Sequence, residues 1–203
     1  TKEERSVPVP EEADEALIPP GTQQAGTVYT IGESEGRHAP FRIETQTLPG
    51  SGKTNISGTP GKKMKESFET ACDYLQANMR ELRRDETLDE YNINVQVLNP
   101  ADASEGGETS VGLLVGIVSG ILDRPVRPQA VVLGAMSLMG ELVAVSSLVD
   151  KLQLAADSGA KTVLLPAKNK EDLAKIPDEL LDQLQLVFYT DPLDAASKAI
   201  ELE

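Results

Sequence analysis

Side chains able to do acid–base or nucleophilic chemistry gather at two places in the sequence. The first is the stretch from Glu105 to Ser110, which reads Glu-Gly-Gly-Glu-Thr-Ser and ends a polar loop that begins at Asn99. A helix is expected to follow it, so free backbone N–H groups and a partial positive charge are expected there. The second is Lys151, in the first turn of another predicted helix. We expect the first place to favour anionic groups.

The helix that follows this loop is predicted from Thr109 to about Leu122. Its residues are apolar on every side, and its small members are glycines and a serine. A helix without a polar face is a buried one. The loop before Thr109 therefore opens a helix in the interior of the fold.

Other reactive residues do not form a recognisable site. The segment from Pro49 to Thr54 resembles a phosphate-binding loop, but Thr47 stands where that motif needs its first glycine. The single histidine, His38, falls in a predicted turn, away from the centre of the fold where a catalytic histidine would stand. Cys72 lies on the apolar stripe of a predicted helix without a basic neighbour, so we expect an unreactive thiol. No cluster of residues has the spacing of a metal site.

Hydrophobic periodicity predicts an α/β fold of mixed type with one continuous core from about residue 27. Strands are expected at 27–31, 41–45, 91–98, 130–136, 141–145, 161–165 and 186–190, and helices at 61–84, 109–122, 146–159, 168–175, 177–184 and 192–202. The first two strands should form a hairpin around a turn at 32–40. Ser146-Ser147 should cap the helix that contains Lys151.

Composition and charge bound the domain organisation. The chain has 203 residues, 39% of them hydrophobic, and a net charge of −14, which argues against a nucleic-acid surface. Residues 1–26, rich in Glu and Pro, are expected to form a linker or extended arm, and 27–203 a single domain. One cysteine and the lack of a signal peptide or long apolar run favour a cytoplasmic domain without membrane contact. The missing initiator Met suggests a piece of a longer chain.

Several motifs resemble the C-terminal proteolytic domain of Lon proteases. They are Gly58–Gly61 with Met64–Ser67, similar to the opening segment of that domain; Arg124–Arg127, similar to its GRPVR motif; Lys161–Pro166, similar to its KTVLIP motif; and Asn169–Leu173 with Ile176-Pro177. The resemblance covers the chain from about Gly26 to its C-terminus. It implies the Lon proteolytic-domain fold.

That family hydrolyses peptide bonds with a Ser-Lys dyad, in which a lysine accepts the proton of the nucleophilic serine. Alignment forward from Arg124–Arg127 places the dyad lysine on Lys151, and alignment backward places Glu108 on the nucleophile. A glutamate beside a buried lysine would form an ion pair and keep the lysine protonated. Neither a nucleophile nor a base would remain, so the resemblance implies a silent site.

Two further departures from the family pattern agree with this hypothesis. Ser146-Ser147 replace paired glycines, and Leu133–Ala135 replace a Thr-Gly-Glu segment. The alternative is an active dyad of Lys151 with Ser110 or, with weaker support, with Ser104 or Thr109. Two residues along a helix rotate a side chain by about 200°, so we expect Ser110 to point away from Glu108.

A narrower resemblance points to the Lon-related branch of BREX phage-defence systems. It is carried by Gly26–Tyr29, by Glu108 in the serine position, and by Phe188–Pro192 with Ala195-Ala196. It implies an N-terminal AAA+ ATPase part that would bind ATP and Mg, with no cofactor in this domain. The wider family implies a homo-oligomeric, commonly hexameric ring.

Three hypotheses follow from these resemblances. The domain is a degenerate Lon fold kept for assembly and coupling to the ATPase, a working ATP-dependent serine endopeptidase, or a module that binds a peptide or partner. Nucleic-acid contact is not expected from this domain.

Overall fold

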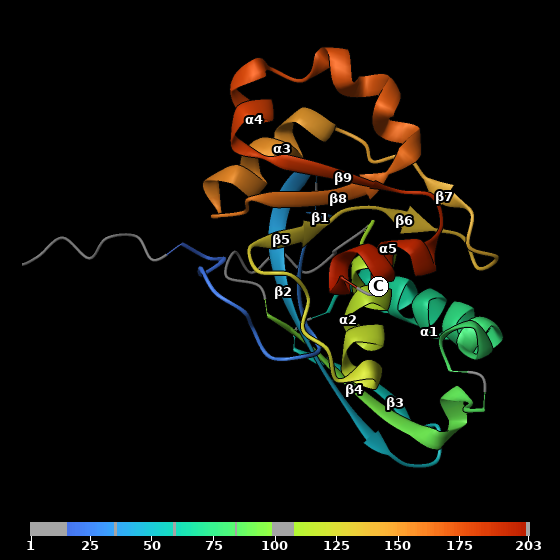
Figure 1. Cartoon of the computed structure of the whole chain (residues 1–203). Helices are drawn as coiled ribbons and strands as arrows, with labels where there is room; N and C mark the ends of the chain where they lie inside the picture. The colour runs from blue at the N-terminus through green and yellow to red at the C-terminus, as the bar shows by residue number, and fades with distance from the viewer. Residues whose placement is uncertain (1–15, 35, 59, 84, 99–107, 202–203) are drawn as a thin grey trace, which may run out of the picture.

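The computed structural model describes residues 16–34, 36–58, 60–83, 85–98 and 108–201 (Figure 1). The strands are β1 Thr27–Ser34, β2 Arg37–Pro49, β3 Thr54–Gly58, β4 Tyr91–Leu98, β5 Ala130–Val132, β6 Ala135–Met136, β7 Leu142–Val143, β8 Thr162–Pro166 and β9 Gln185–Tyr189. The α-helices are α1 Lys62–Leu82, α2 Ser110–Leu122, α3 Leu148–Asp157, α4 Asp178–Gln183 and α5 Pro192–Ile200. Two 3₁₀ segments are η1 Leu88–Glu90 and η2 Ala167–Lys175. These elements confirm the predicted mixed α/β class.

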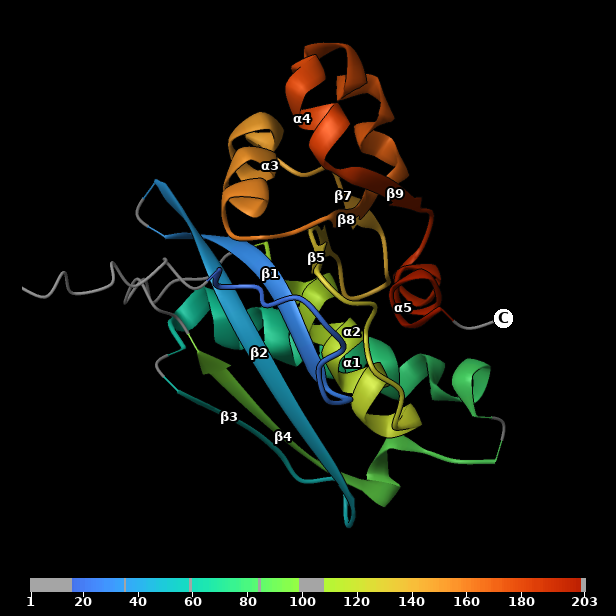
Figure 2. The ribbon, with the colours of Figure 1, turned by 60° about the vertical axis from the view of Figure 1, so that its left-hand side comes forward.

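The strands form a seven-stranded sheet in the order β3-β4-β2-β1-β5-β8-β9. The pairs β1·β2 and β2·β4 are antiparallel, and the other four pairs are parallel. β6 and β7 form a separate antiparallel hairpin. Figure 2 shows the long β2 crossing β1 and β4, with α1 and α2 behind them.

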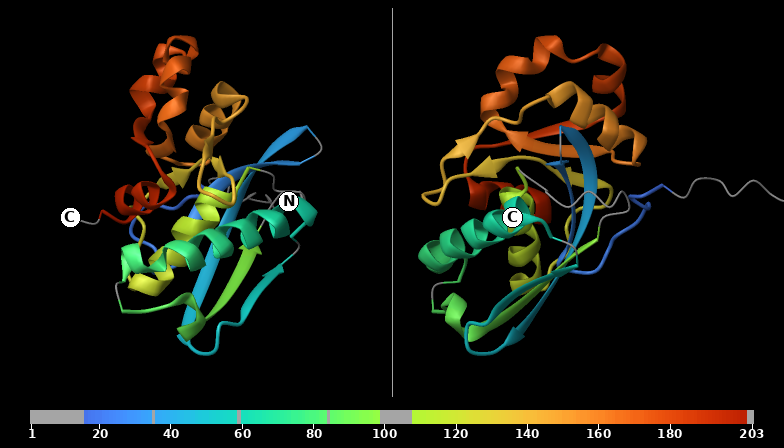
Figure 3. Two further views of the ribbon diagram at one scale, coloured as in Figure 1. Left: turned by 90° about the vertical axis from the view of Figure 1, so that its right-hand side faces the viewer. Right: turned by 180° about the vertical axis from the view of Figure 1, so that it is seen from behind.

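Helices cover both faces of the sheet, as parallel strands require. One buried cluster lies between the strands and α1, α2 and α5, and a second joins the opposite face to α3, α4 and their flanking segments. The two views in Figure 3 show these two helical groups on either side of the strands. The prediction of one continuous core was therefore wrong, because the sheet separates two cores.

Helix α2 lies in the interior, as its all-apolar sequence predicts. Each residue from Ser110 to Ser119 is buried. Its glycines allow close packing: a Cβ at Gly112 would approach the Thr30 side chain to 3.0 Å, and one at Gly116 would approach Thr45 Oγ1 to 3.1 Å. The site before Ser110 is thus fixed to the most buried helix of the fold.

Several local predictions differ from the structure. The hairpin turn predicted at 32–40 is much shorter, since β1 and β2 pair as far as Ser34 and Arg37, which places His38 in a strand. The strand predicted at 130–136 breaks at Gly134, which has φ +132°. Ser147 precedes α3 but its side chain makes no capping hydrogen bond, because its backbone is left-handed with φ 48°.

The start of the described chain packs against the domain. Ile18 is 1% exposed and belongs to the second core, and its N–H donates to the Ser158 carbonyl at 2.9 Å. Ile18, which lies in the predicted arm, therefore contributes to the core. Among the described residues, no helix has the length and apolarity needed to cross a membrane.

Candidate functional site

Two helix starts bring the candidate site together. Glu108 lies two residues before α2, in a left-handed conformation with φ 62°. Lys151 lies in the first turn of α3, where its N–H donates to the Ser147 carbonyl at 3.2 Å. The Lys151 side chain is 1% exposed and the Glu108 side chain 28% exposed. A buried amine thus faces a carboxylate that solvent still reaches.

The side chains of Glu108, Lys151 and Ser146 form one hydrogen-bonded group. Lys151 Nζ donates to Glu108 Oε2 in a short contact. The Ser146 hydroxyl lies 3.0 Å from Glu108 Oε1 and 3.1 Å from Oε2, so it donates to the carboxylate. Lys151 Nζ lies 3.5 Å from Ser146 Oγ. A buried ammonium needs such partners, because an isolated charge in the interior is costly.

Ser110, the alternative nucleophile, lies elsewhere. It is 3% exposed, and its Oγ accepts a hydrogen bond from the Met136 N–H at 2.9 Å. Within the described part of the chain it makes no hydrogen bond to Lys151. The structure therefore brings Lys151 to Glu108 and ties Ser110 to β6.

The two weaker nucleophile candidates also differ in their surroundings. Thr109 is fully buried, and its hydroxyl contacts Met64 Sδ at 3.2 Å. Ser104 lies outside the described residues, as does the Gly106-Gly107 pair.

A buried amide supports the segment that carries Ser146. Asn169 is 0% exposed; its Oδ1 accepts from the Val145 N–H at 2.8 Å, and its Nδ2 donates to the Val145 carbonyl at 3.1 Å. Asn169 Nδ2 also donates to Asp172 Oδ2 at 3.0 Å. Hydrogen bonds from Lys175 and Asn169 lower the pKa of Asp172. This support fixes the backbone immediately before Ser146.

The segment Leu133–Ala135 contacts the first turn of α2. The Tyr189 hydroxyl donates to the Leu133 carbonyl at 2.6 Å, and the Val111 N–H donates to the Gly134 carbonyl at 3.3 Å. Burial raises the pKa of Tyr189, so it remains a neutral donor. The segment positions backbone without contributing an acid or a hydroxyl to the site.

Residues that sequence reasoning set aside do not join this group. Burial, followed by the charges of Asp73 and Glu69, raises the pKa of the Cys72 thiol to about 12. His38 lies in β2 opposite Glu33. Over the described ranges, no group of three or more His, Cys, Asp or Glu side chains is arranged to hold a metal ion.

The sequence did not predict the roles of Ser146 and Asn169 in the site. Ser146 was interpreted only as a replaced glycine and a helix cap, and Asn169 only as part of a motif. The signal that could have found Asn169 is its place in the segment that follows a strongly apolar strand, where a buried amide usually bonds backbone. No local signal indicates that the Ser146 hydroxyl faces Glu108.

Comparison with known proteins agrees with this architecture. The family model of the Lon protease (S16) C-terminal proteolytic domain matches residues 21–201. The "Lon-like protease BrxL" of Escherichia coli O9:H4 (strain HS) is 36% identical over 98% of this chain, and that of Bacillus cereus (strain H3081.97) is 33% identical over 98%. The "Lon protease" of Escherichia coli (strain K12) is 32% identical over 71% of this chain.

The chain spans only part of each of these relatives: 29% and 30% of the two BrxL proteins and 18% of the Escherichia coli Lon protease. The match nevertheless covers nearly the whole chain and includes both helix starts of the site. The chain therefore belongs to the family of Lon protease (S16) C-terminal proteolytic domains.

Proposed function

We propose that this chain is a Lon-type proteolytic domain without peptidase activity, which serves assembly and ATPase coupling in a larger phage-defence protein. The observation that carries the proposal is the contact between Lys151 and Glu108, the two residues that the motif alignment places on the family's dyad. A Ser-Lys dyad needs a hydroxyl within hydrogen-bond reach of an amine that can accept its proton. Here the amine donates to a carboxylate.

The surroundings of the pair support the same conclusion. A carboxylate favours the charged form of a neighbouring amine, and that form cannot act as a base. The nearest described hydroxyl is that of Ser146, which is engaged with Glu108. Ser110 is held by Met136 and is almost fully buried. Ser146 is exposed and its hydroxyl lies 3.5 Å from Lys151 Nζ, but the Glu108 carboxylate holds both groups.

The pair is well placed for a structural role. It links the start of α2, which belongs to the first core, to the start of α3, which belongs to the second. An ion pair across the sheet would keep the two helical groups in register while an attached motor moves. The domain would then transmit force without cutting a polypeptide.

The context of a larger protein rests on the comparisons and on the motifs. Relatives named Lon-like protease BrxL extend well beyond the matched region, which leaves room for an ATPase part that binds ATP and Mg. The BREX-like motifs support a role in bacteriophage defence. A homo-oligomeric, commonly hexameric ring and a cytoplasmic location complete the proposal.

An active endopeptidase is the second candidate, since the relatives are named proteases. Cleavage of casein and of a fluorogenic peptide separates the two. The assay uses the longer ATPase-containing protein with ATP, as wild type, Ser110→Ala and Lys151→Ala. The proposal predicts background cleavage in all three. Cleavage by the wild type that both substitutions abolish would overturn it.

A further inference from the structure

A large hollow lies at the end of α2 that is away from Glu108 and Lys151. It has a volume of about 860 Å³ and is lined by residues 22–25, 44–47 and 94–96 with Thr27, Arg42, Ser57, Gly120 and Asp123. We call it the polar groove. Gly120 and Asp123, at the far end of α2 from Glu108, belong to its wall, so roughly 20 Å of helix separates the groove from the ion pair.

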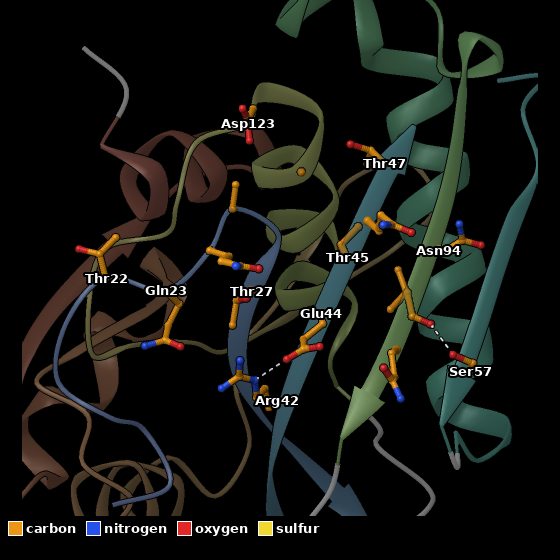
Figure 4. Close-up of a pocket in the computed structure, with 16 residues that line it drawn as sticks. Thr22, Gln23, Thr27, Arg42, Glu44, Thr45, Thr47, Ser57, Asn94 and Asp123 are labelled. Carbon is orange, nitrogen blue, oxygen red and sulfur yellow. Dashed lines mark hydrogen bonds and ion pairs between the residues drawn. The ribbon is translucent and has the colours of Figure 1, made fainter. Parts of the chain in front are cut away.

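Figure 4 shows the segments that line the groove. Thr22 and Gln23 lie on one side, Asp123 lies at the end of α2, and Asn94 and Ser57 lie across β2 on the other side. Nearly all its lining side chains carry hydroxyl, amide or charged groups. An apolar ligand would find few apolar contacts in such a site, whereas a polypeptide backbone could form hydrogen bonds with the lining groups.

The floor of the groove contains an incomplete strand pairing. β1 pairs with β2 only as far as Glu44, whereas β4 pairs with β2 as far as Pro49. The last bond toward β1 runs from the Thr45 N–H to the Gly26 carbonyl at 2.9 Å. The Gly26 N–H donates to Ser119 Oγ at 2.8 Å instead of returning to Thr45. The β1 side of β2 is therefore open beyond Thr45.

The backbone groups of Thr47 point toward this open side. In an antiparallel pair, neighbouring residues direct their N–H and C=O groups to opposite sides. Thr45 bonds toward β1, so Thr47 faces the same way. Ile93, which lies opposite Thr47, donates to the Lys53 carbonyl at 2.8 Å and so faces β3. Thr47 thus offers one donor and one acceptor to an added strand.

A further observation concerns the charge of the groove. The carboxylate of Asp123 makes no ion pair within the described part of the chain, while Arg42 and Glu44 neutralise each other at 2.8 Å. The uncompensated charge of the groove is negative.

We propose that the polar groove binds an extended, basic segment of a partner polypeptide, which adds as a strand to β2 at Thr45–Pro49. A segment of five residues spans roughly 16 Å as a strand. Its backbone bonds Thr47, and a lysine or arginine side chain reaches Asp123. This site does not depend on whether the dyad position is silent, since the two lie at opposite ends of α2.

The test uses a blocked peptide of alternating threonine and lysine, titrated into the full 203-residue chain and followed by amide chemical shifts. We expect saturable shifts at Thr45, Gln46 and Thr47, and none with the matched threonine–glutamate peptide. Asp123→Asn should weaken binding by about two- to five-fold at low salt, and Asp182→Asn, an exposed residue of α4, should not. Asparagine tolerates the left-handed conformation at position 123, so this variant should fold.

A second variant tests the strand pairing itself. Thr47→Pro removes the only backbone donor that the open side offers between Thr45 and Pro49, and it should abolish binding. If that variant does not fold, the Asp123→Asn result still decides. Equal binding of the acidic peptide, or no shift at Thr45–Thr47, would overturn the proposal. Shifts at the same amides on raising protein concentration without peptide would overturn it too, because a second copy of this chain would then be the occupant.

Discussion

Removing the charge of Glu108 should destabilise the fold, because it leaves the buried ammonium of Lys151 without its counter-charge. Glu108→Gln keeps the shape of the side chain and its contact with Ser146. Breaking a fully buried ion pair costs about 3–5 kcal/mol. The Lys151 side chain is 1% exposed but that of Glu108 is 28% exposed, so water compensates part of the loss. We expect a decrease in the free energy of unfolding of about 2–3 kcal/mol.

A double-mutant cycle separates the pair from the shapes of its members. Lys151→Met keeps the volume and removes the charge, and water can solvate the partly exposed carboxylate left behind. We expect the double variant, Glu108→Gln with Lys151→Met, to lie within about 1 kcal/mol of the wild type, since apolar replacement of a buried pair is often neutral. The coupling energy should exceed about 1.5 kcal/mol.

Urea unfolding followed by circular dichroism at pH 7 provides the measurement. The free energy of unfolding should fall with urea concentration at the same slope in all four proteins, so that differences in midpoint report differences in stability. If Glu108→Gln lowered the free energy of unfolding by less than about 0.5 kcal/mol, the carboxylate would not stabilise the buried lysine, and the reasoning would be refuted.

Two further perturbations follow from the structure. Asn169→Ala leaves the N–H and the carbonyl of Val145 without their buried partner, so it should lower the free energy of unfolding by about 2–3 kcal/mol; a loss below about 1 kcal/mol in urea unfolding would mean that water replaces the amide. The raised pKa of Cys72, about 12 against 9.0, means that the unfolded chain loses the thiol proton first as the pH rises. Stability should therefore fall between about pH 9 and pH 12, by up to about 1.4 kcal/mol per pH unit more in the wild type than in Cys72→Ala. Parallel pH profiles of the two proteins would contradict this.

Periodicity predicted the elements whose burial is one-sided or complete. In α1 the apolar positions recur at helical spacing; Met64, Phe68, Ala71, Cys72, Leu75 and Met79 are buried, and Leu82 is partly buried. In β4 the alternation of Ile93, Val95 and Val97 with polar residues matches the burial pattern. These patterns are local, because each repeats within one element, and so they can be read without knowing the neighbours.

Features that depend on pairing between distant segments could not be predicted in the same way. The separation into two cores follows from helices on both faces of the sheet, and strand order is not visible in any single segment. The overhang of β2 beyond β1 arises because Gly26, with φ +89°, turns the chain toward Ser119. The alternation of buried and exposed residues in β2 does not indicate where its pairing with β1 ends.

The candidate site came from family alignment and not from pattern. Glu108 and Lys151 are distant in sequence, and the structure brings their side chains into contact through the starts of α2 and α3. Ser146 completes the group because the backbone after Val145, held by Asn169, directs its hydroxyl toward the carboxylate. The left-handed conformation of Ser147 shows why a simple capping rule did not apply.

Restoring the hydroxyl tests the central claim most directly. The longer ATPase-containing protein would be compared as wild type and as Glu108→Ser, with Glu108→Ala as the matched control, by the rate of fluorogenic peptide cleavage in the presence of ATP. The account predicts background rates for the wild type and for Glu108→Ala, and cleavage above background only for Glu108→Ser. Peptide cleavage by the wild type that Glu108→Ser or Glu108→Ala removes would show that the carboxylate takes part in catalysis, and it would contradict the account.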